Sequence, residues 1–332
     1  MAKKETSEKF KTMIGGQALI EGILMLGPDK SSVVVRSGGE LKIRTEPRRL
    51  PKKHSVTRWP LIRGVVNFFR SMKTGVEALM YSADLFSDEE DDAEPVKQSR
   101  LDAWLEKKLS SEKAKGALVT FSVCLGLLFS VALFFVLPSL LGSAVRAWLT
   151  QNEFAVTLIE GVVRILIFLA YLFLVSRMND MKRVFSYHGA EHKTIRCYEA
   201  GLPLTVENVR KQTRLHPRCG TSFLFVVMIV SILVFSLANP ILRPIFPDVS
   251  NGFLNALIRV AMKLLLLPLV VGISYEFNRL VGRYDNWLTR ALSRPGMWLQ
   301  YLTTREPDEG MMEVGIAALT EVLPEQEGSD RW

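Results

Sequence analysis

The sequence predicts an α-helical integral membrane protein with four transmembrane helices and a cytoplasmic α+β N-terminal region that contains a small β-hairpin and an amphipathic helix. Three observations support this fold class. First, 48% of the 332 residues are hydrophobic although the net charge is +8, and the apolar residues are concentrated in four long segments. Second, positive charge is concentrated in alternate connections between these segments. Third, the residues before the first segment show the patterns of a hairpin and of an amphipathic helix.

The four apolar segments are each long enough to cross a bilayer as a helix. About 20 apolar residues, rising about 1.5 Å each, span a hydrocarbon core of about 30 Å. The segments are Gly116–Gly142, Phe154–Ser176, Thr221–Leu242 and Leu254–Tyr275. An apolar stretch of about 10–14 residues is typical of a buried helix in a soluble protein, and these segments are longer. We therefore expect four transmembrane helices.

The connections predict on which side of the membrane each part lies. Ser143–Glu153 and Arg243–Phe253 carry one arginine each, whereas Arg177–Gly220 carries nine Lys or Arg. Positively charged loops stay in the cytoplasm, so we expect both termini and this middle segment on the cytoplasmic side of the inner membrane. The first residues have no apolar stretch after their charges, which is unlike a signal peptide. Cys197 and Cys219 would face a reducing compartment, where a structural disulfide is not expected.

The region before the first transmembrane segment carries two short patterns. Ser31–Glu46 alternates apolar and polar residues around Gly38-Gly39, which predicts a β-hairpin. Trp59–Phe86 has apolar residues at helical spacing, which predicts an amphipathic helix. This helix either packs on the membrane domain, which we favour, or lies in the headgroup layer. Ser87–Pro95 is acidic and is expected to be a solvated linker.

These patterns divide the chain into six consecutive segments. They are the cytoplasmic N-terminal α+β region (1–86), an acidic linker with a lead-in helix (87–115), transmembrane helices one and two (116–176), a cytoplasmic His/Cys segment (177–220), transmembrane helices three and four (221–275) and a cytoplasmic C-terminal tail (276–332). In the tail, only Met311–Leu323 has a modest helical pattern.

The middle segment contains the pattern that most suggests chemistry. In "YHGAEHKTIRCYE" (Tyr187–Glu199), His188 and His192 lie four residues apart and Glu191 directly precedes the second histidine. On a helix, this spacing places both imidazoles on one face, where they can hold one metal ion. H-x-x-E-H is the inverted zinc-protease pattern, in which the glutamate acts as a general base. His216 and Cys219 follow in "HPRCGT", and zinc prefers imidazole and thiolate ligands.

The number of ligands decides the kind of site, and the sequence leaves it open. If His188, His192, His216 and Cys219 all bind a divalent ion, the coordination is complete and the site is structural. If three of them bind, a fourth position stays open and Glu191 can act as general base. Glu276, at the cytoplasmic end of the fourth transmembrane helix, is a further ligand candidate, and Glu21 is a weaker one. Glu199 is too far along the helix, and Cys197 points to the opposite face.

Several motifs together resemble one known family. They are "GGQALIEGILMLGP", "YHGAEHKTIRCYE", "LTVENVR", "HPRCGTSFL" and "GISYEFNRL". The chain from about Met13 to Leu302 is similar to the YqhQ family of uncharacterised bacterial membrane proteins, often labelled predicted metal-dependent enzymes. The resemblance implies His188, Glu191, His192, His216 and Cys219 as the metal-site residues, and it implies no particular substrate.

Charged residues inside the predicted transmembrane helices require partners, because a charge facing lipid costs a few kcal/mol. Glu160 and Arg259 lie at similar depth in the second and fourth helices, and we predict that they pair. Such a pair would fix helix packing. The alternative is a polar pathway, as in a small transporter.

The sequence thus predicts a membrane-embedded, zinc-type metal-dependent enzyme, with hydrolytic chemistry at the cytoplasmic membrane face. The alternatives are a non-enzymatic membrane scaffold or regulator with a structural metal site, and a small transporter. The lipid bilayer is the expected partner, and the sequence identifies neither a substrate nor a protein partner. No nucleic-acid binding is expected, because membrane topology already accounts for the basic loops.

Overall fold

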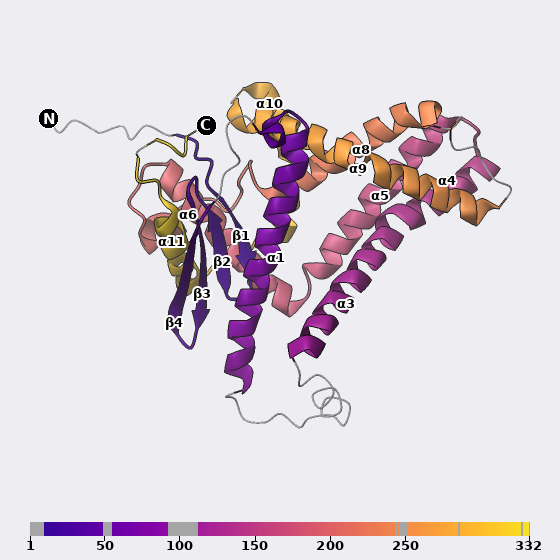
Figure 1. Cartoon of the computed structure of the whole chain (residues 1–332). Helices are drawn as coiled ribbons and strands as arrows, with labels where there is room; N and C mark the ends of the chain where they lie inside the picture. Colours follow the sequence, from indigo (N-terminus) through magenta and orange to yellow (C-terminus); the bar gives the residue numbers. More distant parts are fainter. Residues whose placement is uncertain are drawn as a thin grey trace. The chain divides into compact units, whose positions relative to one another are not determined.

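The computed structural model describes residues 10–48, 55–91, 112–242, 245, 251–284, 286–326 and 328–331 (Figure 1). The chain divides into two compact units. The first comprises Met1–Glu89, Leu172–Val227 and Leu269–Trp332, and the second comprises Glu90–Tyr171 and Met228–Pro268. The candidate metal-site residues all belong to the first unit.

A four-stranded antiparallel sheet with the order β1-β2-β3-β4 forms the centre of the first unit. Its strands are β1 (Gly15–Leu19), β2 (Gly22–Leu26), β3 (Lys30–Ser37) and β4 (Glu40–Pro47). The predicted hairpin is confirmed: Ser37 pairs with Glu40 across Gly38-Gly39. Both glycines have positive φ, 58° and 81°, as a tight hairpin turn requires. The hairpin β1–β2 was not predicted, because β2 is buried on both faces and shows no alternation.

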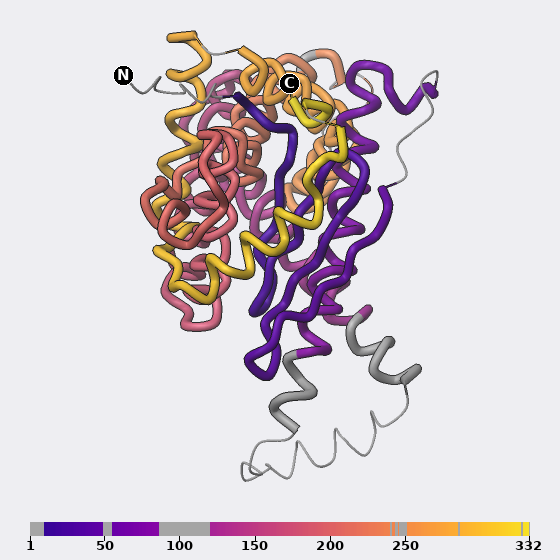
Figure 2. The backbone as a smooth tube through the Cα atoms, turned by 90° about the vertical axis from the view of Figure 1, so that its left-hand side faces the viewer, coloured from indigo at the N-terminus to yellow at the C-terminus, as the bar shows by residue number. Residues whose placement is uncertain are grey.

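Helices cover both faces of this sheet. Helix α6 (Asn179–Glu199) and helix α11 (Glu309–Val322) pack on one face, where Ile23, Val34 and Ala190 share a core. Figure 2 shows α11, in yellow, alongside the indigo strands. Helix α1 (Ile62–Asp91) covers the other face, where Ala78 packs on Leu19 and Leu24. The sheet therefore fixes the position of α6, which carries the H-x-x-E-H pattern.

Helix α1 covers most of the segment Trp59–Phe86 for which an amphipathic helix was predicted. Its first turns contact the last part of helix α9 (Gly252–Arg283), where Arg63 forms an ion pair with Glu276. Nearby, Asn67 donates a hydrogen bond of 2.8 Å to the Tyr275 hydroxyl. The short elements η1 (Val56–Arg58) and α7 (Val206–Arg210) and the longer helix α10 (Trp287–Thr303) complete this unit. Helix α10 was not predicted, and Pro295 lies inside it.

Within the described ranges, four helices are long and apolar enough to cross a membrane, by length and composition, and they overlap the four predicted segments. They run through Thr120–Trp148, Glu153–Val175, Gly220–Asn239 and Gly252–Arg283. The corresponding elements are α3 (Glu112–Val131), the π-helical turn η2 (Ala132–Val136), α4 (Leu137–Trp148), α5 (Glu153–Val175), α8 (Gly220–Leu242) and α9.

The second unit contains a buried ion pair. The Glu160 carboxylate of α5 contacts the Lys263 ammonium of α9, and both side chains are only 4% exposed. Lys263 also donates a hydrogen bond of 2.7 Å to the Ser139 hydroxyl. A Cβ atom on Gly142 would collide with Glu160, so this glycine allows α4 to approach the pair. We predicted Arg259 as the partner of Glu160, and the structure places Lys263, one turn further along α9, against the carboxylate.

Candidate metal centre

Helix α6 is buried around most of its circumference where it carries the candidate ligands. Ala190, Glu191, His192, Lys193 and Thr194 are all at most 5% exposed. The polar members of this run have partners: Lys193 reaches Glu306 at 2.6 Å, and Thr194 donates a hydrogen bond of 2.8 Å to the Ala190 carbonyl. A helix with a polar and fully buried turn is unusual, because buried polar groups lose their water. Such a turn is typical of a functional site inside the protein rather than of a solvent-exposed helix surface.

Gly189 allows a second chain segment to cross α6 at close range. A Cβ atom at this position would lie 1.9 Å from the Arg305 carbonyl oxygen, so no larger residue fits without a backbone shift. The crossing segment is held there because the Arg305 amide donates a hydrogen bond of 2.8 Å to the Phe185 carbonyl. This contact brings the neighbouring Thr303 carbonyl to the His188 ring.

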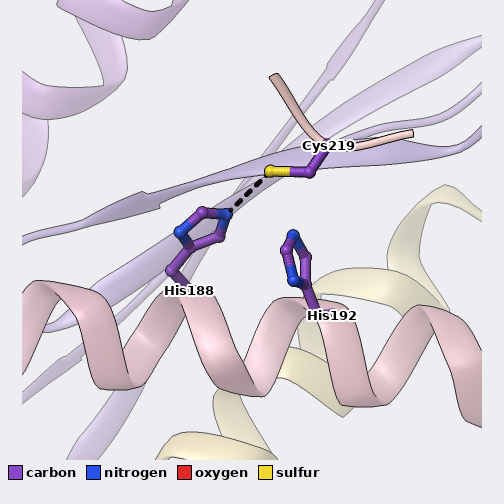
Figure 3. Close-up of side chains that lie close together, drawn as sticks. All are labelled: His188, His192 and Cys219. Atoms are coloured by element: carbon purple, nitrogen blue, oxygen red, sulfur yellow. Dashed lines mark hydrogen bonds between the residues drawn. The ribbon is translucent and has the colours of Figure 1, made fainter. Parts of the chain in front are cut away.

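Three ligand atoms from His188, His192 and Cys219 converge within 4.8 Å of one another. Figure 3 shows both imidazoles rising from one face of α6 toward the Cys219 sulfur. The His188 Nε2 atom lies 3.1 Å from Cys219 Sγ, and the two imidazole centroids are 4.4 Å apart. The two imidazoles therefore share one face of the helix, as their spacing predicts, and a cysteine from a distant segment faces them.

Backbone carbonyls fix the orientation of both imidazoles. The Nδ1 atom of His188 lies 2.8 Å from the Thr303 carbonyl oxygen, and that of His192 lies 2.5 Å from the Arg214 carbonyl oxygen. A carbonyl only accepts hydrogen bonds, so both Nδ1 atoms must carry a proton. In the neutral rings, both Nε2 atoms then hold lone pairs. The His192 Nε2 atom is buried and has no hydrogen-bond partner among the described residues.

Cys219 lies directly before the N-terminus of α8, where its surroundings favour the thiolate form. The Thr221 amide is 3.5 Å from its sulfur, and helix N-termini favour negative charge. Burial opposes ionisation, but the charges of His188 and His192 hold the pKa of the thiol well below its usual value. Burial likewise lowers the pKa of His188, yet the charge and hydrogen bond of Cys219, the charge of Glu191 and the Thr303 carbonyl together outweigh it and raise that pKa to about 9. Both pKa shifts have the directions that mutual attraction between a His188 imidazolium and a Cys219 thiolate produces.

Glu191 lies beside the three ligands and is fixed by the sheet. One carboxylate oxygen accepts a 3.0 Å hydrogen bond from the Gly16 amide of β1, and the other lies 4.0 Å from His188 Nε2. A Cβ atom on Gly16 would lie 2.6 Å from the Leu24 carbonyl oxygen and 3.1 Å from the Glu191 carboxyl carbon. Burial raises the pKa of Glu191. The predicted base is thus positioned next to the convergence point of the ligands.

His216 lies near these ligands but faces another residue. Its ring centroid is 5.5 Å from that of His192, and its Nε2 atom is 3.5 Å from a Glu199 carboxylate oxygen. Gln300 clamps the His216 backbone, with hydrogen bonds of 2.7 Å to its amide and its carbonyl. Burial lowers the pKa of His216 to about 4, so the ring is neutral.

The two carboxylates named as further candidates are engaged elsewhere. Glu276 pairs with Arg63, whose Nε atom lies 2.6 Å from it. Glu21 pairs with Arg183 and accepts a 3.1 Å hydrogen bond from the Tyr187 hydroxyl. Within the described part of the chain, the structure brings His188, His192 and Cys219 together and does not bring Glu276 or Glu21 to them.

The groups that orient the ligands were missed by sequence reasoning. Thr303 and Arg214 act through backbone carbonyls, which leave no side-chain signal. Gln300 is fully buried in a tail for which only one other helix was expected. Gly16 and Gly189 had a usable signal, since a glycine beside polar residues often marks a close backbone approach.

Comparison with known proteins places this arrangement in a family. The sequence profile of DUF1385, described as a protein of unknown function, matches residues 59–325. The chain belongs to the DUF1385 family. It is also 33% identical over 321 residues to the uncharacterized protein YqhQ of Bacillus subtilis (strain 168), which covers 96% of this chain and 94% of that protein. No solved structure gives a significant match.

The family assignment confirms the resemblance seen in the motifs. The DUF1385 match includes His188, Glu191, His192 and Cys219. Strand β1, whose Gly16 amide donates a hydrogen bond to Glu191, lies before the first matched residue. The alignment with YqhQ spans nearly the whole of both chains.

Proposed function

We propose that this protein is a membrane-embedded, zinc-type metal-dependent enzyme with hydrolytic chemistry at the cytoplasmic membrane face. His188, His192 and Cys219 are its metal ligands, and Glu191 is its general base. One observation carries the proposal: both imidazoles direct Nδ1 to a backbone carbonyl, and the buried Nε2 atom of His192 has no hydrogen-bond partner among the described residues. Buried polar atoms are nearly always hydrogen-bonded or bound to a metal, so this imidazole nitrogen beside the Cys219 sulfur is best explained as a ligand for a cation.

The donor set and the spacing fit zinc. Zinc prefers thiolate and imidazole ligands, and a carbonyl that orients the distal imidazole nitrogen is a common feature of its sites. Ligand atoms about 2.0–2.3 Å from a tetrahedral Zn²⁺ lie about 3.3–3.6 Å apart. The atoms here lie within 4.8 Å of one another, with one pair at 3.1 Å, so side-chain adjustments of about 1 Å suffice.

Three protein ligands leave one coordination position open, as in catalytic zinc sites. When bound, the ion would supply Lewis-acid polarisation and a lowered pKa for water. Glu191 is positioned to hold a proton next to that open position, because the Gly16 amide fixes one carboxylate oxygen and leaves the other toward His188. Its raised pKa brings it closer to neutral pH, where a general base works best.

Elemental analysis of the purified full-length protein tests the metal itself. The wild type should retain close to one zinc per chain, and the variants His188→Ala/His192→Ala and Cys219→Ser should retain far less. Glu191→Gln should retain the wild-type amount, because Glu191 is assigned as a base. A wild-type protein that stays metal-free after purification with added zinc contradicts the proposal.

Cobalt substitution separates a catalytic site from a structural one. An open position should allow added azide to change the visible spectrum of the Co²⁺ protein. A structural site, with a fourth ligand such as His216, should give a spectrum that azide does not change. In that case the His216→Ala variant should respond to azide, because the substitution removes the fourth ligand. The protein would then be a scaffold or regulator with a structural metal site rather than an enzyme.

A further inference from the structure

A cavity of about 590 Å³ lies in the first compact unit, on the side of α6 that carries Arg196 and Glu199. Its walls come from α6, from the end of α9, from one side of α10 and from the loop before α8. This volume is within the range of about 300–1,000 Å³ that small-molecule sites occupy. None of the three proposed metal ligands lines it.

The cavity wall carries a strong excess of positive charge. Among the described residues that line it, one carries a carboxylate, Glu199, and five are cationic: Lys11, Arg196, Arg218, Arg290 and Arg294. Glu199 is already engaged, because it pairs with Arg218 and accepts a 2.9 Å hydrogen bond from the Thr12 amide. Cationic side chains therefore outnumber carboxylates among the described lining residues. Arginine clusters of this kind recognise phosphate, since the guanidinium group donates two parallel hydrogen bonds to its oxygens.

The position of the cavity along α9 indicates a membrane-surface location. Val281 and Gly282 line the cavity and belong to the last turn of α9, whose residues Gly252–Arg283 form a candidate span. A group bound there lies where that helix leaves the apolar layer. Charged lipid headgroups occupy this level of a bilayer.

Helix α10 has the character of a helix that lies at a membrane interface. Its exposed side chains include Trp287, Trp298 and Tyr301, which are 79%, 64% and 59% exposed. Tryptophan and tyrosine are enriched where membrane meets water. The same helix directs Arg290 and Arg294 to the cavity. Aromatic anchors and phosphate-binding cations on one helix are the combination expected for a lipid headgroup site.

We propose that this cavity binds the phosphate group of an anionic ligand, and that its position selects a membrane phospholipid as the source. Arg290 and Arg294 bind the phosphate from the α10 side, and Arg196 adds charge from α6. Glu199 positions Arg218 on the opposite wall. Binding requires these cations and no metal ion, so the proposal stands apart from the enzyme assignment.

The experiment uses the purified full-length protein in a neutral detergent. The probes are dihexanoyl phosphatidic acid, dihexanoyl phosphatidylcholine and glycerol 3-phosphate, titrated by intrinsic tryptophan fluorescence. The test variant is Arg290→Gln/Arg294→Gln, whose two side chains are exposed in the absence of ligand. The matched control is Lys42→Gln/Arg44→Gln, which removes the same charge from exposed positions on β4 of the same unit.

Phosphatidic acid should bind the wild type and the control saturably, and the Arg290→Gln/Arg294→Gln variant at least about tenfold more weakly. Phosphatidylcholine, whose headgroup is zwitterionic, should bind the wild type at least about tenfold more weakly than phosphatidic acid. Comparable affinity for glycerol 3-phosphate would assign the same phosphate site to a soluble ligand. Equal phosphatidic acid affinity in the two double variants overturns the proposal, as does equal affinity of the wild type for both lipids. Repeating the titration on the His188→Ala/His192→Ala variant keeps this result separate from that of the metal site.

Discussion

Replacing Gly189 by alanine tests whether the crossing of α6 by the segment around Arg305 positions the proposed metal ligands. The new Cβ atom would lie 1.9 Å from the Arg305 carbonyl oxygen, and ordinary contact begins at 3.4 Å, so one backbone must move by about 1.5 Å. Overpacking of this kind costs typically about 1–3 kcal/mol, and a clash with backbone belongs at the upper end. Alanine regains about 1 kcal/mol of helix propensity. The net loss in the free energy of unfolding should therefore be about 2 kcal/mol.

The same shift should weaken zinc binding. Moving this segment displaces the Thr303 carbonyl that orients His188, and losing such an orienting partner typically lowers metal affinity about 10–100-fold. Stability is measured by thermal unfolding of the metal-free protein, because bound metal would itself stabilise the fold. Zinc affinity is measured by competition with a chromogenic chelator.

Gly310→Ala, in helix α11 of the same unit, is the matched control. The new Cβ atom would lie 3.5 Å from its nearest neighbours, which are atoms of Arg36 and Asp308. This variant should leave zinc affinity unchanged and gain up to about 1 kcal/mol in stability. A Gly189→Ala protein with wild-type stability and zinc affinity would show that this close crossing does not position the site.

Three further outcomes follow from the buried charges. Burial lowers the pKa of His216 from 6.5 to about 4, so between these pH values the ring takes up a proton when the protein unfolds. The free energy of unfolding of the metal-free protein should therefore fall by up to ~3 kcal/mol as the pH falls from 6.5 to 4. In pH-dependent thermal melts a His216→Gln variant should lose less stability over that interval, and an unchanged pH dependence would contradict a buried neutral ring. The lowered pKa of Cys219 predicts rapid alkylation of this residue by iodoacetamide at pH 7 in the metal-free protein. His188→Gln should slow this alkylation about tenfold, measured by mass spectrometry of the peptide that contains Cys219. Equal alkylation rates in the wild type and the variant would exclude the imidazolium–thiolate pair. Lys263→Met should destabilise the protein by about 3–5 kcal/mol in detergent, because Glu160 is left buried without its partner. The double variant Lys263→Met/Glu160→Gln should regain most of that stability. If the single variant is as stable as the double variant, the ion pair does not contribute to stability.

Local regularities were sufficient for the parts of the fold that they specify. Four long apolar segments predict four helices because no other spanning structure satisfies the backbone within one segment. Gly38-Gly39 predicts the β3–β4 hairpin because only glycine readily adopts positive φ at both turn positions. Helical periodicity alone placed His188 and His192 on one face. These predictions depend on residues within a few positions of one another in the chain.

Contacts between distant segments decided the rest. β2 was not predicted because burial on both faces removes the alternation of a strand, and α10 was not predicted because Pro295 interrupts a helical pattern. The partner of Glu160 depended on how α9 is rotated against α5, and a single turn changes it from Arg259 to Lys263.

The sequence by itself determined the four long apolar helices, the pair of histidines on one helical face and the glutamate beside them, because each is a property of one continuous segment. Only the tertiary structure decided that Cys219 joins the histidines while His216 turns to Glu199. It also decided that the Thr303 and Arg214 carbonyls determine which nitrogen of the His188 and His192 rings carries the proton. The physical reason is that convergence of side chains and the direction of a carbonyl depend on where separate segments pack. A carbonyl is present at every residue, and its direction is not encoded in the identity of its side chain.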